Sequence, residues 1–292
     1  MCRDGRLIST LGFLVLGAAA AAQTPESLDN LLARVGSRIE AFYERAQSLI
    51  CDEKVTAQPI RADLSIDGFA RVLEYDLRVE LAAADGEDPE VSFVRQLRKV
   101  NGRLPKPRDL NDRQSCLDPD PAAPEPLTFL LARNRREYMF SWAGYGKGKD
   151  LNTFQIDYRP AKVEKAEFHE DKYGRDDCFQ LSLPVERQGR IWIDARTFDV
   201  LRVEQQLESR VDVRIPWAQQ RRLNLPDSII VDRFRMVTRY QPVAFHDPEE
   251  TLLLPASIEE LALLHGAQSH RRTQVFSNYR RFLTSGRMVR DQ

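Results

Sequence analysis

Hydrophobic and polar residues alternate with a period of two along a stretch of the chain that begins at Phe69. This period places successive side chains on opposite faces, so it predicts a long β-strand with one buried and one polar face. A second strand is expected at 90–100, joined to the first as a hairpin through Asp85-Gly86. The apolar face of the first strand comprises Phe69, Leu73, Tyr75, Leu77, Val79 and Leu81.

Further strand-like segments follow in close succession in the second half of the chain. Short connections with turn residues indicate antiparallel pairing and not helical crossovers. One connection, Gly144-Tyr-Gly146-Lys-Gly148, is glycine-rich but lacks the phosphate-binding loop pattern, so it is interpreted as a hairpin turn. Strands are expected at 136–143, 151–159, 162–170, 176–184, 190–194, 199–208, 228–243 and 273–282. The segment 255–264 could be a strand or a short helix, and we favour the strand.

One amphipathic helix is expected near the start, over about 25–49. Thr24 followed by Pro25 is a helix-start signature. Apolar residues then recur at spacings of three and four, which gives a stripe that must pack on a large apolar surface. A proline-rich irregular loop at 103–126 and a short helix at 126–132 complete the pattern. The sequence thus predicts a mainly β protein with a single domain at 23–292.

The first ~22 residues resemble a cleavable secretory signal peptide. Arg3 and Arg6 precede an apolar run, and Ala20 with Ala22 satisfies the rule for a cut before Gln23. The alternative is a membrane anchor, but the run of about 16 residues is at or below the length that spans a bilayer. Because no cysteine lies at the expected cut, a lipid-attachment site is not expected. The mature protein is therefore expected in the periplasm or outside the cell, and not as an integral membrane protein.

Charge and motifs exclude several classes of function. The net charge is −1, which gives no general attraction to nucleic acid. The four histidines form no metal-ligand pair, and neither a serine-hydrolase elbow nor a cofactor motif is present. No catalytic residue, metal or cofactor is therefore assigned, although a pair of catalytic carboxylates can be neither argued nor excluded from sequence.

Three cysteines remain in the mature chain, so an oxidising compartment allows one internal disulfide and one free thiol. Cys116 lies in the proline-rich loop, which has freedom to reach a partner. We favour Cys51–Cys116, with Cys178 buried in a strand, while the other pairings stay open.

Two features could bind a ligand. The first is a set of arginines on the late strands, which could hold an anionic headgroup or could simply face solvent opposite acids; these are Arg233, Arg235, Arg239, Arg271, Arg272, Arg280 and Arg281. The second is the apolar strand faces, which are core in a closed sandwich but line a groove in an open, curved sheet. The candidate groove residues are Phe69, Leu73, Tyr75, Leu77, Val79, Ile230, Phe234 and Met236.

The segment from Gly189 to Glu204 resembles a hairpin of LolA/LolB-like proteins, the superfamily of outer-membrane lipoprotein carriers. The matching residues are Trp192, Asp194, Thr197 and Arg202. Two further segments, Thr251-Leu-Leu-Leu-Pro255 and 276–282, resemble secreted bacterial proteins of the acidobacterial type whose function is unknown.

The resemblance implies an antiparallel half-barrel of about eleven strands with a helix in its concave face and an apolar inner surface that receives acyl chains. Asp194 and Arg202 would then form an opposite-charge pair across the hairpin. Three hypotheses follow. The first is a non-catalytic carrier for a lipid, an acyl chain or a lipoprotein. The second is a structural or interaction protein with a closed core and an envelope protein partner. The third is a hydrolase of envelope polymers.

Overall fold

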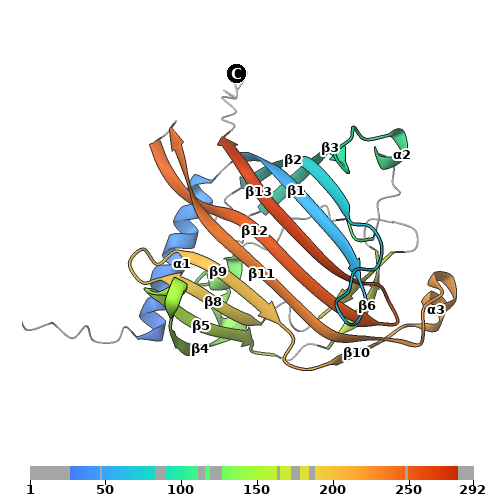
Figure 1. Ribbon diagram of the computed structural model, residues 1–292. Helices are drawn as coiled ribbons and strands as arrows, with labels where there is room; N and C mark the ends of the chain where they lie inside the picture. Colours follow the sequence, from blue (N-terminus) through green and yellow to red (C-terminus); the bar gives the residue numbers. More distant parts are fainter. Residues whose placement is uncertain are drawn as a thin grey trace, which may run out of the picture.

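One curved antiparallel sheet of eleven strands dominates the protein (Figure 1). This computed structural model describes residues 27–46, 48–82, 90–110, 116–118, 127–162, 165–171, 178–183, 188–246 and 249–281. The strand order is β3-β2-β1-β13-β12-β11-β9-β8-β5-β4, with β10 paired to β11. Since β3 and β4 are both edges, the sheet does not close. The mainly β, half-barrel class expected from the sequence is confirmed.

The strands are β1 Ser48–Ile60, β2 Arg71–Ala82, β3 Glu90–Val100, β4 Tyr138–Tyr145, β5 Thr153–Pro160, β8 Gly189–Asp194, β9 Val200–Gln206, β10 Val211–Arg214, β11 Ser228–His246, β12 Glu249–His265 and β13 Ser269–Arg281. A separate hairpin pairs β6 Glu167–Glu170 with β7 Phe179–Ser182. The helices are α1 Leu28–Arg45, α2 Pro107–Leu110 and α3 Trp217–Leu223, with single 3₁₀ turns at η1 Leu127–Leu130, η2 Arg135–Glu137 and η3 Gly148–Asp150.

The helix α1 packs against one face of the sheet, called the inner face below. Its N-cap is Ser27, whose hydroxyl accepts a hydrogen bond from the backbone N–H of Asn30 at 3.3 Å. The expected N-cap, Thr24, lies outside the described residues. A Cβ on Gly36 would meet the carbonyl oxygen of Leu130 at 3.0 Å, so the helix lies close against η1. Figure 1 shows α1 beside β5, β8 and β9, and its buried stripe packs with residues of these strands.

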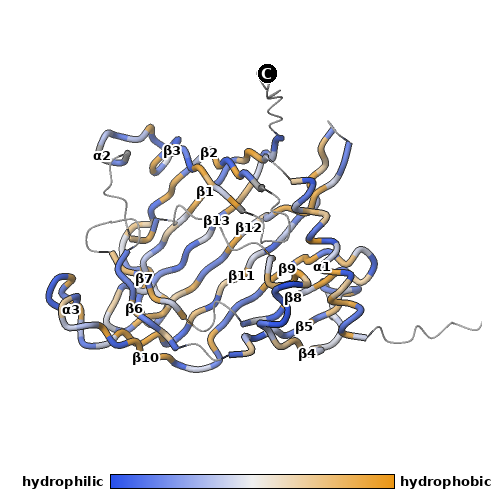
Figure 2. Tube along the Cα trace, turned by 180° about the vertical axis from the view of Figure 1, so that it is seen from behind, coloured by the Kyte–Doolittle hydropathy of each residue, from blue (hydrophilic) through white to orange (hydrophobic). Residues whose placement is uncertain are grey.

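Strand β1 was not expected, because the helix was extended to residue 49. The helix ends at Arg45, and β1 enters the middle of the sheet between β2 and β13. Its inner face is apolar except at Glu53, which is buried. Figure 2 shows hydrophobic and hydrophilic residues alternating along the neighbouring strands β12 and β13 as well. The expected hairpin of β2 and β3 is confirmed, while its turn lies outside the described residues.

The longest hairpin, β11–β12, projects beyond its neighbours (Figure 1). Pairing of β11 with β9 ends at Arg239, and pairing of β12 with β13 begins at Ser257. Between these points and the tip, the two strands pair only with each other among the described residues. A β-bulge after Arg239 changes the facing of the side chains at this point.

The disulfide joins Cys116 to Cys178, with Cα atoms 5.3 Å apart, so the expected Cys51–Cys116 pairing is wrong. Cys51 is a buried free thiol near the start of β1. The segment that contains Cys116 is anchored away from Cys51, because Asp118 Oδ1 forms an ion pair with Arg71 Nε at 2.8 Å. Because Arg71 lies opposite Ala57, the anchor is about 20 Å along the strand from Cys51. Cys178 lies just before β7 and not within a strand.

Most of the late-strand arginines are paired with acids, as the solvent-face alternative expected, but Arg272 and Arg281 are largely covered and do not lie on an open solvent face. Arg235 binds Glu204 at 2.8 Å, and Arg239 binds Glu259 at 2.7 Å. Further pairs are Arg272–Glu260, Arg280–Asp52 and Arg281–Glu250. Within the part of the chain that the structure describes, no helix has the length and hydropathy needed to cross a bilayer.

Candidate ligand-binding pocket

A cavity of about 530 Å³ lies between α1 and the inner face of the sheet. Its walls include residues of β1, β2, β3 and β13, of β9, and of the projecting β11–β12 hairpin. The apolar lining residues are Ile39, Phe42, Tyr43, Leu49, Cys51, Leu77, Val79, Val91, Phe93, Leu127, Phe198, Val200, Leu201, Tyr240, Pro242, Leu253, Leu254, Pro255, Phe276 and Tyr279. The volume is within the range of about 300–1,000 Å³ that is common for small-molecule sites.

The helical spacing of the apolar stripe puts one end of α1 into the pocket wall. Ile39, Phe42 and Tyr43 recur at three and four residues, so they share one face of the helix. Ile39 and Tyr43 are buried, and the rings of Phe42 and Tyr43 lie edge to face with centroids 5.4 Å apart. The other end of the helix packs on η1, so only the C-terminal part is available to the cavity.

Hydroxyl and thiol groups in the walls stay uncharged at neutral pH. Burial, together with the charge of Glu53, raises the pKa of the Cys51 thiol to about 12. Burial also raises the pKa of Tyr240 above its ordinary value. Tyr279 Oη donates to the carbonyl oxygen of Pro255 at 2.7 Å, so this phenol already has an acceptor. Apart from the charged residues at the mouth, the walls therefore offer an apolar ligand a surface without charge.

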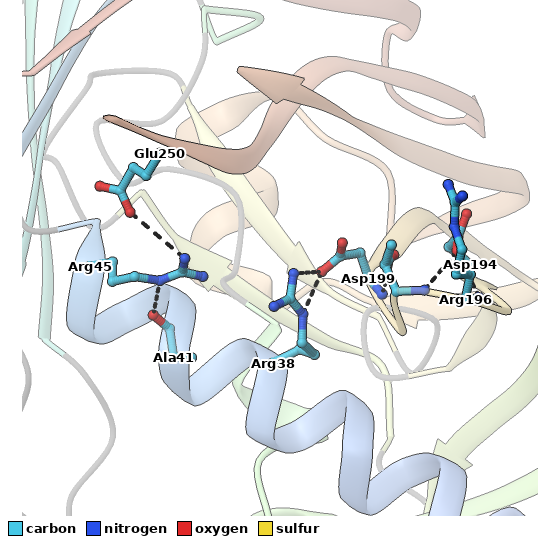
Figure 3. Close-up of polar contacts among 8 residues, drawn as sticks. Arg38, Ala41, Arg45, Asp194, Arg196, Asp199 and Glu250 are labelled. Carbon is cyan, nitrogen blue, oxygen red and sulfur yellow. Dashed lines mark hydrogen bonds and ion pairs between the residues drawn. The ribbon is translucent and has the colours of Figure 1, made fainter. Parts of the chain in front are cut away.

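Charged residues line the mouth of the pocket (Figure 3). Arg38 of α1 holds Asp199 with two hydrogen bonds, at 2.8 Å from Nη2 and 3.0 Å from Nε. Two helical turns further on, Arg45 donates from Nε to the carbonyl oxygen of Ala41 at 2.9 Å. Its Nη1 lies 3.7 Å from Glu250 on the projecting hairpin. The pocket reaches the surface here, because its lining residues Pro242 and Thr251 are exposed.

The turn between β8 and β9 forms one side of the mouth and is shaped by Asp194. This carboxylate accepts from the backbone N–H groups of Arg196 and Thr197, both at 2.9 Å. Burial opposes ionisation of Asp194, but these hydrogen bonds outweigh it and lower its pKa. Phe198 adopts φ of 65° at the end of the turn and is buried against the pocket. The turn thereby positions an aromatic wall.

The expected pairing of Asp194 with Arg202 is wrong. Arg202 Nη2 binds Asp150 at 3.1 Å, and its guanidinium lies 3.5 Å from the ring centroid of Trp192. The register explains the difference, because Arg202 lies opposite Trp192 and not opposite Asp194. The four residues of the hairpin motif thus shape the sheet and the turn. Asp194 and Thr197 line the pocket, and Trp192 and Arg202 do not.

The candidate groove residues divide into two groups. Leu77 and Val79 line the pocket. Leu73 and Tyr75 are buried one step further along β2 in a different apolar cluster, with Val55 as a neighbour. The other four do not line the pocket: Phe69, Ile230, Phe234 and Met236.

Two reasons account for the residues that lie elsewhere. Phe69 precedes β2 and is 98% exposed, so its expected inward orientation is wrong. On β11 a bulge after Val231 changes the alternation, and Val231 is buried in place of Ile230. Phe234 packs near the β6–β7 hairpin, and Met236 packs near Cys51 and Phe276.

Several lining residues were not foreseen, although signals for some were present. The apolar stripe of α1 was recognised as needing a large partner, and it includes Ile39, Phe42 and Tyr43. The segment 251–255, noted only for its resemblance, supplies Leu253 and Leu254. Leu49 and Cys51 were missed together with β1.

The arrangement is suited to binding by burial of apolar surface. The two lining carboxylates are engaged, Asp194 with the turn backbone and Asp199 with Arg38. Among the described residues, no group of histidine, cysteine and acidic side chains is placed to hold a metal ion.

No protein-family model matches the chain, and no curated protein matches it. Among solved structures, the chain is similar to the crystal structure of a LolA superfamily protein from Nitrosomonas europaea. The two share 8% sequence identity with a TM-score of 0.36, over 86% of this chain and 93% of that chain. Because identity and TM-score are both low, no residue role is carried over from that protein.

Proposed function

We propose that the protein is an exported, non-catalytic carrier that binds the apolar chain of a lipid or lipidated ligand in the pocket between α1 and the sheet. The observation that carries the proposal is the cavity of about 530 Å³, whose walls are mainly apolar with charged residues at the mouth. Burial of a hydrocarbon chain contributes about 0.8 kcal/mol of binding free energy for each methylene group. Burial of one acyl chain is therefore enough to bind the ligand without a covalent bond.

Export fits two features of the chain. The first ~22 residues have the pattern of a secretory signal, and the Cys116–Cys178 disulfide requires an oxidising compartment to persist. An apolar ligand outside the cytoplasm needs shelter from water, which a pocket with a helix on one side provides.

The cavity favours a carrier over an interaction protein with a closed core. In a closed core, side chains from the two walls interdigitate without a void of this size. Here Leu77 and Val79 of the sheet and Phe42 and Tyr43 of α1 line the same cavity.

Displacement of a fluorescent apolar probe by hexadecanol tests the proposal. The wild-type protein should bind hexadecanol at one site, and Val79→Trp should weaken binding because the indole fills the pocket. Val94→Trp is the matched control, since Val94 is 62% exposed on the adjacent strand β3 and does not line the pocket. Thr251→Trp is a second blocking variant at an exposed lining position, where folding is not at risk. Absence of binding by wild type, or equal binding by all four proteins, would contradict the proposal.

A further inference from the structure

One carboxylate and two guanidinium groups meet at the mouth of the pocket. Glu250, near the tip of the projecting hairpin, pairs with Arg281 at the end of β13. Arg45 at the end of α1 approaches the same carboxylate, with Nη1 at 3.7 Å (Figure 3). A single negative charge between two positive charges leaves the cluster with one positive charge in excess.

Arg281 is fully engaged within this cluster. Its side chain is 10% exposed, it pairs directly with Glu250, and Nη2 donates to the backbone carbonyl of Arg45 at 2.8 Å. Its guanidinium also lies 5.1 Å from the ring centroid of Phe245. Arg281 therefore serves to hold the hairpin and the helix end together.

Arg45 retains donors for another group. Its distance of 3.7 Å to Glu250 exceeds hydrogen-bond length, and only Nε makes a hydrogen bond to the described protein, to Ala41. The side chain is 41% exposed and lines the pocket. The pocket lining holds two further arginines. Arg38 differs in this respect, because two of its nitrogens already bind Asp199. Arg196 lies on the turn between β8 and β9, away from Glu250 and Arg45 (Figure 3).

We propose that the ligand is a single-chain lipid acid whose anionic group binds Arg45 while its chain occupies the apolar cavity. This inference rests on the proposed function and names the class of ligand. A carboxylate or a phosphate would neutralise the excess positive charge and accept charge-assisted hydrogen bonds from the guanidinium. A neutral headgroup would leave that charge unmatched. A cavity of about 530 Å³ suits one chain and a small headgroup.

Three ligands with the same chain separate the headgroup from the hydrocarbon: palmitate, hexadecyl phosphate and hexadecanol. Their affinities are measured by probe displacement at a pH where both acids are ionised. Wild type should bind the acids about tenfold more tightly than the alcohol. This is the gain in affinity expected from one charge-assisted hydrogen bond. In Arg45→Gln the preference for the acids should fall close to one, and Arg45→Lys should restore part of it.

The control is Arg222→Gln. Arg222 forms an exposed pair with Glu170 at 3.2 Å, is part of α3 and does not line the pocket, so this variant should keep the full preference. Thermal unfolding checks that each variant is folded, and Arg45→Lys decides the matter if Arg45→Gln does not fold.

The outcomes distinguish the two proposals. Equal binding of acids and alcohol by wild type would overturn the headgroup inference and leave the carrier function standing. A preference retained in Arg45→Gln would overturn the role of Arg45. Absence of binding of all three ligands would contradict the carrier function itself. A preference for only one of the two acids would support the inference and identify its headgroup.

Discussion

Glu53 on β1 and Arg95 on β3 form an ion pair across the intervening strand β2, with Nε 2.6 Å and Nη2 3.1 Å from the carboxylate oxygens. Both side chains are buried, with exposures of 0% and 7%. The pair lies beside the pocket. Cys51, two residues before Glu53 on β1, lines the pocket, and so does Leu77, which lies opposite Arg95 in the β2–β3 register. The bidentate geometry satisfies the charges that burial would otherwise penalise.

Replacing Glu53 by Gln should lower the free energy of unfolding by about 3 kcal/mol, because the buried pair loses one of its two charges. Urea unfolding at neutral pH measures the change. Glu74→Gln is a matched control on β2, since Glu74 pairs with Lys99 at 2.9 Å near the surface and should lose less than about 1 kcal/mol. Equal effects of the two substitutions would show that the buried pair has no special role.

Stability should fall at acid pH through Glu260. Burial opposes its ionisation, but the charge of Arg272 and the hydrogen bond with His270 outweigh burial and lower the pKa from 4.5 to about 2. Because the folded-state pKa lies below the unfolded value, the stabilisation is present above pH 4.5 and is lost as the pH falls toward 2. The contribution should be on the order of 3 kcal/mol.

Urea unfolding of Glu260→Gln across this pH window measures that contribution. The variant should be less stable than wild type at neutral pH and should approach it near pH 2. Glu259→Gln is the control, because Glu259 is exposed and pairs with Arg239. A difference between wild type and Glu260→Gln that stays constant with pH would contradict the assignment.

The Cys116–Cys178 disulfide should stabilise the fold by about 4 kcal/mol, since it closes a chain segment with a sequence separation of 62. Thermal or urea unfolding of Cys116→Ser/Cys178→Ser measures the loss. Peptide mapping without reduction should recover Cys116 linked to Cys178, and Cys51 should react with a thiol reagent only after unfolding, since it is buried. Recovery of Cys51 in a disulfide would contradict the structure.

The elements that the sequence predicted well are those with uninterrupted patterns. The alternation from Leu73 to Leu77 identified β2 and its buried face, and the apolar stripe identified α1. The segment 255–264, for which a strand was favoured over a short helix, is part of β12. In each case one face of the element is buried, so apolar residues recur at a regular spacing in the sequence. This spacing can be recognised without knowing which element packs against that face.

The elements that were missed depend on partners far away in the chain. On β1, Glu53 interrupts the apolar alternation, and only Arg95 explains why a carboxylate can be buried there. The helix α3 has no buried residue, so it has no apolar stripe to recognise. The phase of β11 changes at bulges, which explains why Ile230 was chosen in place of Val231.

The pocket was anticipated as an apolar groove but not at its correct place along the strands. Leu77 and Val79 were identified because they continue the alternation of β2. The opposing wall comes from α1, from Phe198 and from the β11–β12 hairpin. These segments meet only through the sheet order, which alternation within a single strand does not specify.

Photolabelling with a hexadecanol analogue that carries a diazirine on its chain tests the central claim most directly. Mass spectrometry of the digested protein should find the label within 39–43 of α1, 77–79 of β2 and 251–255 of β12, and excess hexadecanol should suppress it. Val79→Trp should reduce labelling, while Val94→Trp should not. Labelling confined to exposed apolar residues outside the pocket, such as Phe69 and Trp217, would contradict a chain-binding pocket between α1 and the sheet.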